Sequence, residues 1–364
     1  MKRTQVAAMV SAVAALSSCA TPSLNADEST PSAVRITGGP IPLKTSPVSV
    51  TAGPMGMPFS ATIPVELAPT ELALVPGSSA LFASTSSGDT IAAVDTGTKS
   101  MRARYLAEHK DEHIAINAKG DRIYVATGAV DHSVLVVDTT AGGVVSRVVG
   151  RADQSEIPDQ SLTIDRRTGT LYMASNSWSC FIMKIDTATD SVVSKIPIAD
   201  YGYDLALDEE GNTIYVGTST AVLAIDTKTG LTTATVHLGT QANDVEIETR
   251  TQTLYAANRS ISSISVIDLK THQVVTTIAL QYQPSHIALD HAAKLAYVTA
   301  NNFDSARGLV AEIYVIDTDT NKIIDTYRIT NAQLAGVVVD TESHTAYIAV
   351  PTHGVIALLD RARN

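Results

Sequence analysis

The stretch IYVIDTDTN, Ile313 to Asn321, is an apolar, β-branched run that ends on an Asp-Thr pair. The same kind of ending recurs as VVDTT, KIDTA and AIDTK. Seven such runs close on an Asp, and neighbouring members of the set are 40–49 positions apart: Asp95, Asp138, Asp186, Asp226, Asp268, Asp317 and Asp360. Self-similarity at a steady period is typical of repeat architectures, so the chain is predicted to contain seven structural units.

Each unit holds three further runs with strand character. An alternating segment such as DLALD or HIALD is followed by a short polar turn and a β-branched, aromatic segment, such as RIYVAT from Arg122 or TIYVGT from Thr213. Another run, such as VVSRVVG or VVTTIAL, lies after the Asp. Composition and period favour strands for all of them, named a to d in chain order. Four strands in units of about 40–45 residues predict an all-β, seven-bladed propeller of four-stranded antiparallel blades.

The two ends of the repeat region predict how the ring closes. The seventh unit stops at ALLDRARN and therefore lacks strand d. Near the other end, SATIPVELAPTE, Ser60 to Glu71, has the pattern of a strand d that runs into a strand a, like the segment from Leu231 onward. We therefore expect an N-terminal strand to complete the last blade and cover its exposed edge.

The repeated Asp-Thr pairs are predicted to be turn formers, because Asp and Thr side chains bond backbone N–H groups in tight turns. Together, the Y-V-T/A and V-I-D-T segments resemble the YVTN family of β-propeller repeats over roughly residues 60 to 360. The resemblance implies the propeller fold. It implies little about chemistry, because that family includes surface-layer, secreted and periplasmic proteins of differing roles.

Composition and charge narrow the class of protein. The chain has 364 residues, of which 45% are hydrophobic and 17% charged, as expected for one large β domain. Its net charge of −11 disfavours nucleic acid as a partner, because an acidic surface repels phosphates. The sequence contains no P-loop, GxSxG, HExxH or paired CxxC motif. A monomer is expected.

The N-terminal region has the pattern of an export signal. Residues 1–19 begin with Lys2 and Arg3, continue with a short apolar stretch and end in Leu-Ser-Ser-Cys at Cys19. This ending resembles the lipobox of bacterial lipoproteins, which implies lipidation of Cys19 and a membrane anchor; an ordinary cleaved signal is the alternative. Residues 20–56 are rich in Pro, Ser, Thr and Gly and are predicted to be a flexible tether. The propeller is expected over 57–364, exported and either lipid-anchored or periplasmic or extracellular.

Long connections predict which face of the propeller binds a ligand or protein. The longest ones precede strand a of the third blade or join strands b and c, as in SNSWSCF and NNFDSARGLVAE. All of these connections emerge on one face of a four-stranded meander, and long loops commonly carry function. The loop residues predicted to contact a ligand or partner are Trp178, Phe303, Arg307 and Arg259.

A second set of candidate residues lies at the start of the innermost strands. Counting four positions back from the end of each strand a gives Glu71, His113, Ser161, Asp204, Asp244, His286 and Gly336. These positions are expected at the channel mouth on the face with the long connections, with His353 nearby. Carboxylates and imidazoles suit a divalent metal, assigned to His113, Asp204, Asp244 and His286, or an acid and base pair. The alternative is that these polar groups only bond neighbouring blades.

Three functions remain open at the level of sequence. The first is a binding or interaction scaffold of the cell envelope, with no catalytic residue assigned. The second is a metal-assisted lyase or hydrolase at the channel mouth, since the fold resembles that of virginiamycin-type lyases, in which His and Glu act with magnesium. The third is an accessory subunit of a periplasmic redox enzyme.

Overall fold

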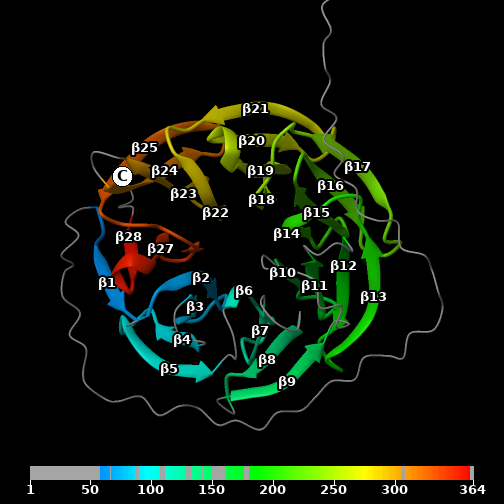
Figure 1. Ribbon diagram of the computed structural model, residues 1–364, viewed down its shortest axis with the longest axis horizontal. Coiled ribbons are helices and arrows are strands. Elements are labelled where there is room, and N and C mark those ends of the chain that lie inside the picture. Colours follow the sequence, from blue (N-terminus) through cyan, green and yellow to red (C-terminus); the bar gives the residue numbers. More distant parts are fainter. Residues whose placement is uncertain are drawn as a thin grey trace, which may run out of the picture.

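The computed structural model describes residues 58–65, 67–86, 90–106, 111–127, 133–140, 143–149, 161–175, 180–304 and 308–360. These residues form seven four-stranded antiparallel sheets, arranged as a ring around a central channel (Figure 1). The predicted all-β, seven-bladed propeller is therefore confirmed. The predicted signal and tether, residues 1–19 and 20–56, lie outside the described residues.

The blades are numbered from the one that contains β2. Strands a, from blade 1 to blade 7, are β2 (Pro69–Leu74), β6 (Asp111–Ile116), β10 (Leu162–Asp165), β14 (Gly202–Asp208), β18 (Asp244–Glu248), β22 (Gln283–Asp290) and β26 (Val337–Asp340). Strands b are β3 (Ala80–Thr85), β7 (Arg122–Thr127), β11 (Thr170–Ser175), β15 (Thr213–Thr218), β19 (Thr253–Asn258), β23 (Leu295–Asp304) and β27 (Thr345–Val350). Strands c are β4 (Thr90–Asp95), β8 (Ser133–Asp138), β12 (Phe181–Asp186), β16 (Ala221–Asp226), β20 (Ser263–Asp268), β24 (Gly308–Asp317) and β28 (Val355–Asp360). Strands d are β5 (Ser100–Leu106), β9 (Gly143–Val149), β13 (Ser191–Pro197), β17 (Thr232–His237), β21 (Gln273–Ala279) and β25 (Lys322–Thr330), with β1 (Ala61–Pro64) in blade 7.

The ring is closed by the N-terminal strand, as the sequence predicts. Strand β1 pairs antiparallel with β28, in a register that places Ala61 opposite Leu358 and Pro64 opposite Val355. The Ser60 amide extends this pairing by donating to the Leu358 carbonyl at 2.9 Å. Ile63 has no exposed surface, so the strand adds to the core between blades as well as to the backbone ladder. Both ends of the repeat region therefore meet in blade 7.

The Asp-Thr pairs form the c-to-d turns. In blade 4, the Asp226 carboxylate accepts hydrogen bonds from the Lys228 and Thr229 amides at 3.0 and 2.7 Å. Equivalent bonds occur at Asp95, Asp138, Asp186, Asp268 and Asp317. Asp360 has no following strand d and accepts the Thr345 hydroxyl instead. The prediction that these carboxylates build turns is confirmed for six of the seven and is wrong for Asp360.

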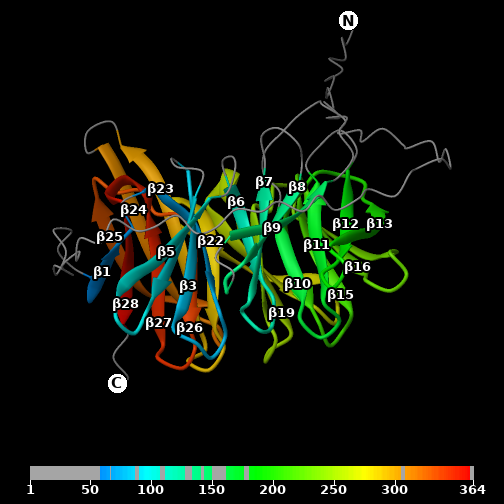
Figure 2. The same ribbon diagram turned by 90° about the horizontal axis from the view of Figure 1, so that it is seen from below.

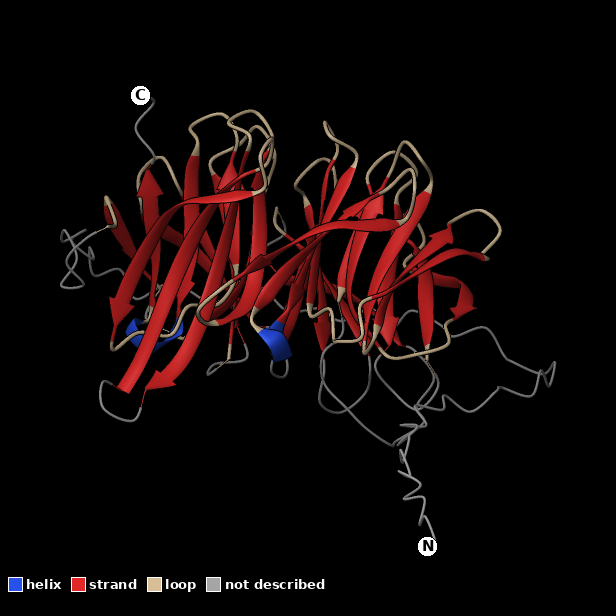
Figure 3. Ribbon diagram, turned by 90° about the horizontal axis from the view of Figure 1, so that it is seen from above, coloured by secondary structure: helices blue, strands red, loops and turns tan. Residues whose placement is uncertain are grey.

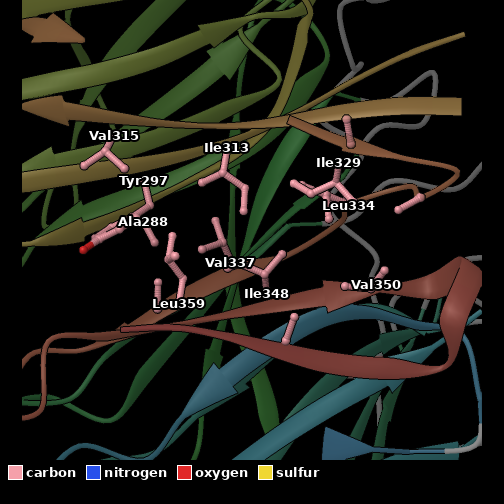
Figure 4. Close-up of a cluster of buried hydrophobic side chains, with 14 of the residues drawn as sticks. Ala288, Tyr297, Ile313, Val315, Ile329, Leu334, Val337, Ile348, Val350 and Leu359 are labelled. Carbon is pink, nitrogen blue, oxygen red and sulfur yellow. The ribbon is translucent and has the colours of Figure 1, made fainter. Parts of the chain in front are cut away.

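The repeated Tyr in strand b explains why the Y-V-T and V-I-D-T segments occur together. Tyr255 of blade 5 is fully buried and donates its hydroxyl to Asn321 Oδ1, at 2.5 Å, in the c-to-d turn of blade 6. Apolar side chains fill the rest of each space between blades. The cluster between blades 6 and 7, which includes Ile313, Val337 and Ile348, is shown in Figure 4. Tyr255 of strand b and the apolar side chains of strands b and c therefore serve contacts between neighbouring blades.

The two faces of the ring differ in their connections. The b-to-c and d-to-a connections lie on what we call the loop face, which carries the 3-10 helices η1 (Arg259–Ile261) and η2 (Pro351–His353); the a-to-b and c-to-d turns lie on the opposite turn face (Figure 3). Among the described residues, no helix has the length and apolar character needed to cross a membrane.

Blade 6 corrects one expectation about the loop face. The segment from Asn301 to Glu312 was predicted to be a long loop. It is largely a β-hairpin, because Asn301 pairs with Ala311 and Asp304 with Gly308 as continuations of β23 and β24. The two strands rise past their neighbours on the loop face (Figure 2). The backbone pairing of this segment therefore extends the blade rather than interrupts it.

Candidate functional site

The central channel has a volume of about 770 Å³ and is lined mainly by the strands a. Six of the seven aligned positions contribute side chains to its wall: Glu71, His113, Ser161, Asp204, Asp244 and His286. The seventh, Gly336, has no side chain to contribute. Because each strand a starts on the loop face, we call these positions the mouth ring. Counting back from the strand ends thus predicted a set of residues that the fold does bring around one channel.

One side of the mouth ring is neutralised by an ion pair. His286 Nε2 lies 2.6 Å from Glu71 Oε1, and both side chains are largely buried, with 26% and 18% of their surface exposed. Burial opposes ionisation of Glu71, but the adjacent His286 lowers the carboxyl pKa below its ordinary value. Burial likewise opposes protonation of His286, yet Glu71 raises the imidazole pKa. Both groups are therefore held in their charged forms.

The opposite side of the ring holds Asp204 and Asp244, which bond neighbouring blades. Asp204 accepts the Ser161 hydroxyl of blade 3 at 2.6 Å and the Val245 amide of blade 5 at 2.8 Å. Asp244 accepts the Ile287 amide of blade 6 at 3.3 Å. The alternative expectation, that ring residues hydrogen-bond the next blade, is confirmed for these two.

These hydrogen bonds do not offset the cost of burying the two carboxylates. Burial raises the pKa of Asp204. Burial, together with the charge of Asp204, raises the pKa of Asp244 well above its ordinary value. Among the described residues, neither forms an ion pair with Lys or Arg within 4.0 Å. Within the described residues, this side of the mouth thus holds acidic groups that no Lys or Arg pairs with, although the charge of His113 acts on Asp204.

Glu246 is a site residue that the sequence analysis missed. It lies in β18 two positions after Asp244 and lines the same channel. Burial and the charge of Asp204 raise its pKa to about 8. The signal was available, because the equivalent positions in the other blades are Ala73, Ala115, Thr163, Ala206, Ala288 and Val338. Glu246 is the one ionisable residue in this second ring.

The predicted metal set, His113, Asp204, Asp244 and His286, gains no geometric support. Within the described part of the chain, no group of three or more His, Cys, Asp or Glu side chains is arranged to hold a metal ion. One nitrogen of His286 is engaged by Glu71, and the other, Nδ1, is buried without a hydrogen-bond partner. A divalent cofactor at this ring stays a prediction.

The remaining predicted residues do not line the channel or lie outside the residues that the structure describes. Arg259 is exposed in η1 on the loop face, where its charge acts on His286. His353 is exposed in η2 and contacts the Thr352 hydroxyl at 3.1 Å, and it is not among the channel-lining residues. Trp178, Arg307 and Cys19, together with the side chain of Phe303, lie outside the described parts of the structure.

At the turn-face ends of the strands a, two buried carboxylates do have basic partners. Asp290 Oδ2 lies 2.7 Å from His344 Nδ1, and Glu248 Oε1 lies 3.2 Å from His291 Nδ1. Both carboxyl side chains have no exposed surface. Each pair joins one blade to the a-to-b turn of the next, so these carboxylates stabilise contacts between blades.

Comparison with known proteins agrees with the fold. The chain is 24% identical over 180 residues to the uncharacterized protein YncE of Salmonella typhi and of Salmonella typhimurium, and 23% identical to YncE of Escherichia coli O157:H7. The alignments cover 44% of this chain and 49% of each relative, so the chain spans about half the length of the curated relatives it matches. No family model matches the chain. The chain is therefore a seven-bladed β-propeller that is similar to YncE over about half its length.

Proposed function

We propose that this propeller is a binding scaffold whose channel mouth, on the loop face, takes a small molecule bearing an ammonium or guanidinium group. The supporting observation is the group of Asp204, Asp244 and Glu246, which line a channel of about 770 Å³ without a Lys or Arg ion pair among the described residues. A cation seated there offsets the burial and the repulsion from Asp204 that raise the pKa values of Asp244 and Glu246. An organic cation fits better than a bare metal ion, because the described residues offer no three-ligand group.

The proposed mode of binding includes proton release. Near neutral pH, Glu246 is mostly protonated, because its pKa is raised to about 8. A cationic ligand favours the ionised form, so binding expels a proton from the channel. Arg259 is exposed on the same face, and its positive charge disfavours a cationic ligand close to His286. This repulsion directs the ligand towards blades 4 and 5.

Calorimetry of the purified protein tests this proposal. The titrants are alkylammonium and alkylguanidinium ions, the matched neutral alcohols, the matched carboxylates, and Mg²⁺ and Zn²⁺. We expect binding of the organic cations only, with heats that depend on the buffer because a proton is released. Asp244→Asn should weaken binding about tenfold or more. Glu342→Gln, an exposed acidic residue at the turn end of the same channel, is the matched control and should bind as the unaltered protein does.

Other results would contradict this function. Binding of none of the titrants, or equal losses in Asp244→Asn and Glu342→Gln, would remove the mouth ring as the site. Binding of Mg²⁺ or Zn²⁺ alone would favour the metal-assisted lyase or hydrolase over the scaffold.

The cellular setting that we propose is the bacterial cell envelope, with an anchor at Cys19. It rests on the sequence pattern of residues 1–19. Cys19→Ala should move the protein from the membrane fraction to the soluble fraction. Unchanged retention in the membrane fraction would contradict lipidation.

A further inference from the structure

The ion pair at the mouth joins two blades that are not neighbours. Glu71 belongs to blade 1 and His286 to blade 6, and blade 7 stands between them in the ring (Figure 1). The other hydrogen bonds of the mouth ring link adjacent blades, as in Asp204 with the Val245 amide. The 2.6 Å contact therefore spans the inner edge of blade 7.

Gly336 makes this contact across blade 7 sterically feasible. It occupies the mouth-ring position of blade 7, and its amide donates to the Thr70 carbonyl of the segment that begins β2 at 2.7 Å. A Cβ at this position would lie 2.7 Å from that carbonyl oxygen and 3.1 Å from the Cα of Glu71. Any other residue would push β2 away. The glycine therefore holds blade 7 close to Glu71 and leaves the mouth open between Glu71 and His286.

Blade 7 is also the blade in which two distant parts of the chain meet. On its outer edge, β1 and β28 are joined by backbone hydrogen bonds between residues about 300 positions apart. That edge can open without the breaking of a covalent bond. Local unfolding costs the least free energy in segments near chain ends. The contact between Glu71 and His286 spans the inner edge of blade 7 and opposes the same opening from the channel side.

We propose that the Glu71 and His286 side chains form an inner clasp, which holds blade 7 in the ring and weakens as pH rises, while β1 acts as the outer, pH-independent clasp. The clasp is a feature of ring closure and does not depend on which ligand the channel takes.

The pH range follows from the two groups and the charges that face them. The pKa of His286 is raised above its ordinary 6.5, so its contribution is complete below about 6.5 and is lost as pH rises through the raised value. The pKa of Glu71 is lowered below its ordinary 4.5, so its contribution is present above about 4.5 and is lost as pH falls through the lowered value. The clasp is therefore strongest at about pH 4.5–6.5 and weakens towards alkaline pH.

Other charged groups around the pair modify this range without replacing it. Asp204 favours protonated His286 and Arg259 opposes it. His113 favours ionised Glu71, and the charge of Glu71 in turn acts on Asp244.

Hydrogen exchange of the full chain tests the clasp. Amide exchange is followed in blade 7, residues 337–360 and 61–64, at about pH 6 and about pH 9, with rates corrected for the intrinsic effect of pH. We expect Glu71→Gln to speed exchange in blade 7 about tenfold at pH 6, and to have little effect at pH 9, where the clasp is already weak. Unaltered protein should show faster corrected exchange in blade 7 at pH 9 than at pH 6, beyond any acceleration in blades 4 and 5, where Asp204 and Glu246 also have raised pKa values.

Two further variants separate the clasp from general loosening. Gly336→Ala should speed exchange in blade 7 at both pH values, because its effect is steric. Arg250→Gln breaks the 2.5 Å ion pair with Asp319 between blades 5 and 6 and should leave blade 7 unchanged. The clasp is refuted if Glu71→Gln leaves blade 7 unaffected or acts equally at both pH values. Equal acceleration of all seven blades would also refute it. Should Glu71→Gln fail to fold, His286→Gln and the pH dependence of the unaltered protein decide by the same criteria.

Discussion

The two ends of the innermost strands, the strands a, carry acidic side chains in opposite situations. At the turn end, Asp165, Glu248 and Asp290 are buried, and a basic side chain lies within 4 Å of each. At the loop end, Asp204, Asp244 and Glu246 line the mouth, and the described residues place no Lys or Arg ion pair on them. Among the described residues, the buried acids of the turn end thus have basic partners, whereas at the loop end Glu71 alone of the mouth-ring acids forms an ion pair, with His286.

Strand β18 shows this contrast within a single segment. Glu248 at its end pairs with His291 of the next blade. Asp244 and Glu246 lie earlier in the same strand, and burial raises the pKa of both. Burial of an acid is therefore a poor indicator of a binding site by itself. The lack of a basic partner is the informative feature, because an unpaired buried charge is what a ligand would stabilise.

The largest expected change in the free energy of unfolding is at the turn end, where the basic partner of a buried carboxylate can be removed. His344→Asn should lower the free energy of unfolding by about 3 kcal/mol, because Asp290 is left buried without its imidazole. Urea unfolding measures the change. His344 has a φ of 58°, which Asn tolerates, so the backbone contributes little to the effect.

His272→Asn is the matched control for that variant. His272 has a φ of 54° in the c-to-d turn of blade 5 and forms no ion pair within the described residues. It should change the free energy of unfolding by less than about 1 kcal/mol. Equal losses in the two variants would mean that the turn conformation, and not the pairing of Asp290, accounts for the effect.

A gain in stability is expected at the loop end. The folded pKa of Glu246 is raised from 4.5 to about 8, so the folded state binds the extra proton and stability falls as pH rises between these values. Glu246→Gln should therefore match the unaltered protein near pH 4.5 and be more stable by about 2 kcal/mol at about pH 9, since water in the channel reduces the full effect.

Urea unfolding of Glu246→Gln at several pH values measures this difference, with exposed Glu342→Gln as the control. A difference that stays constant with pH would show that Glu246 titrates normally. The contrast between the two channel ends would then rest on Asp204 and Asp244 alone.

The smallest effect is expected where a turn-end pair is exposed. Arg167 lies 3.6 Å from Asp165 and 3.7 Å from Glu209, and 46% of its side chain is exposed. Arg167→Gln should cost no more than about 0.5 kcal/mol, because solvent screens the pair. A loss as large as that of His344→Asn would show that pairing at this end is cooperative around the ring.

Much of the fold follows from the sequence because each repeat by itself specifies the strands of one blade. The period of the Asp residues predicts the blades, and the missing last strand predicts that an N-terminal strand completes the last blade, as β1 does on β28. The same alignment also predicts which residues surround the mouth. It does not predict that Asn301 continues a hairpin, because a polar segment with Asn, Asp and Gly has the composition of a loop. The predicted contacts of Trp178 and Arg307 stay predictions.

Partners across the ring are beyond the reach of local patterns. Glu71 and His286 are far apart in sequence and belong to blades 1 and 6, which would not be near each other if the blades stood in an open row. They meet because the ring closes and because Gly336 lies between them. Glu246 occupies a position that repeats as a small or apolar residue, so the sequence marks it as different without saying that its carboxyl lacks a partner.

The sequence by itself determined the number of blades, the strand that closes them and the ring of residues at the mouth, since each repeat encodes one unit and closure follows from counting strands. Only the tertiary structure decided which of those acids are neutralised. Charge pairing depends on distances between side chains from different blades, and those distances exist only once the sheets are packed around the channel.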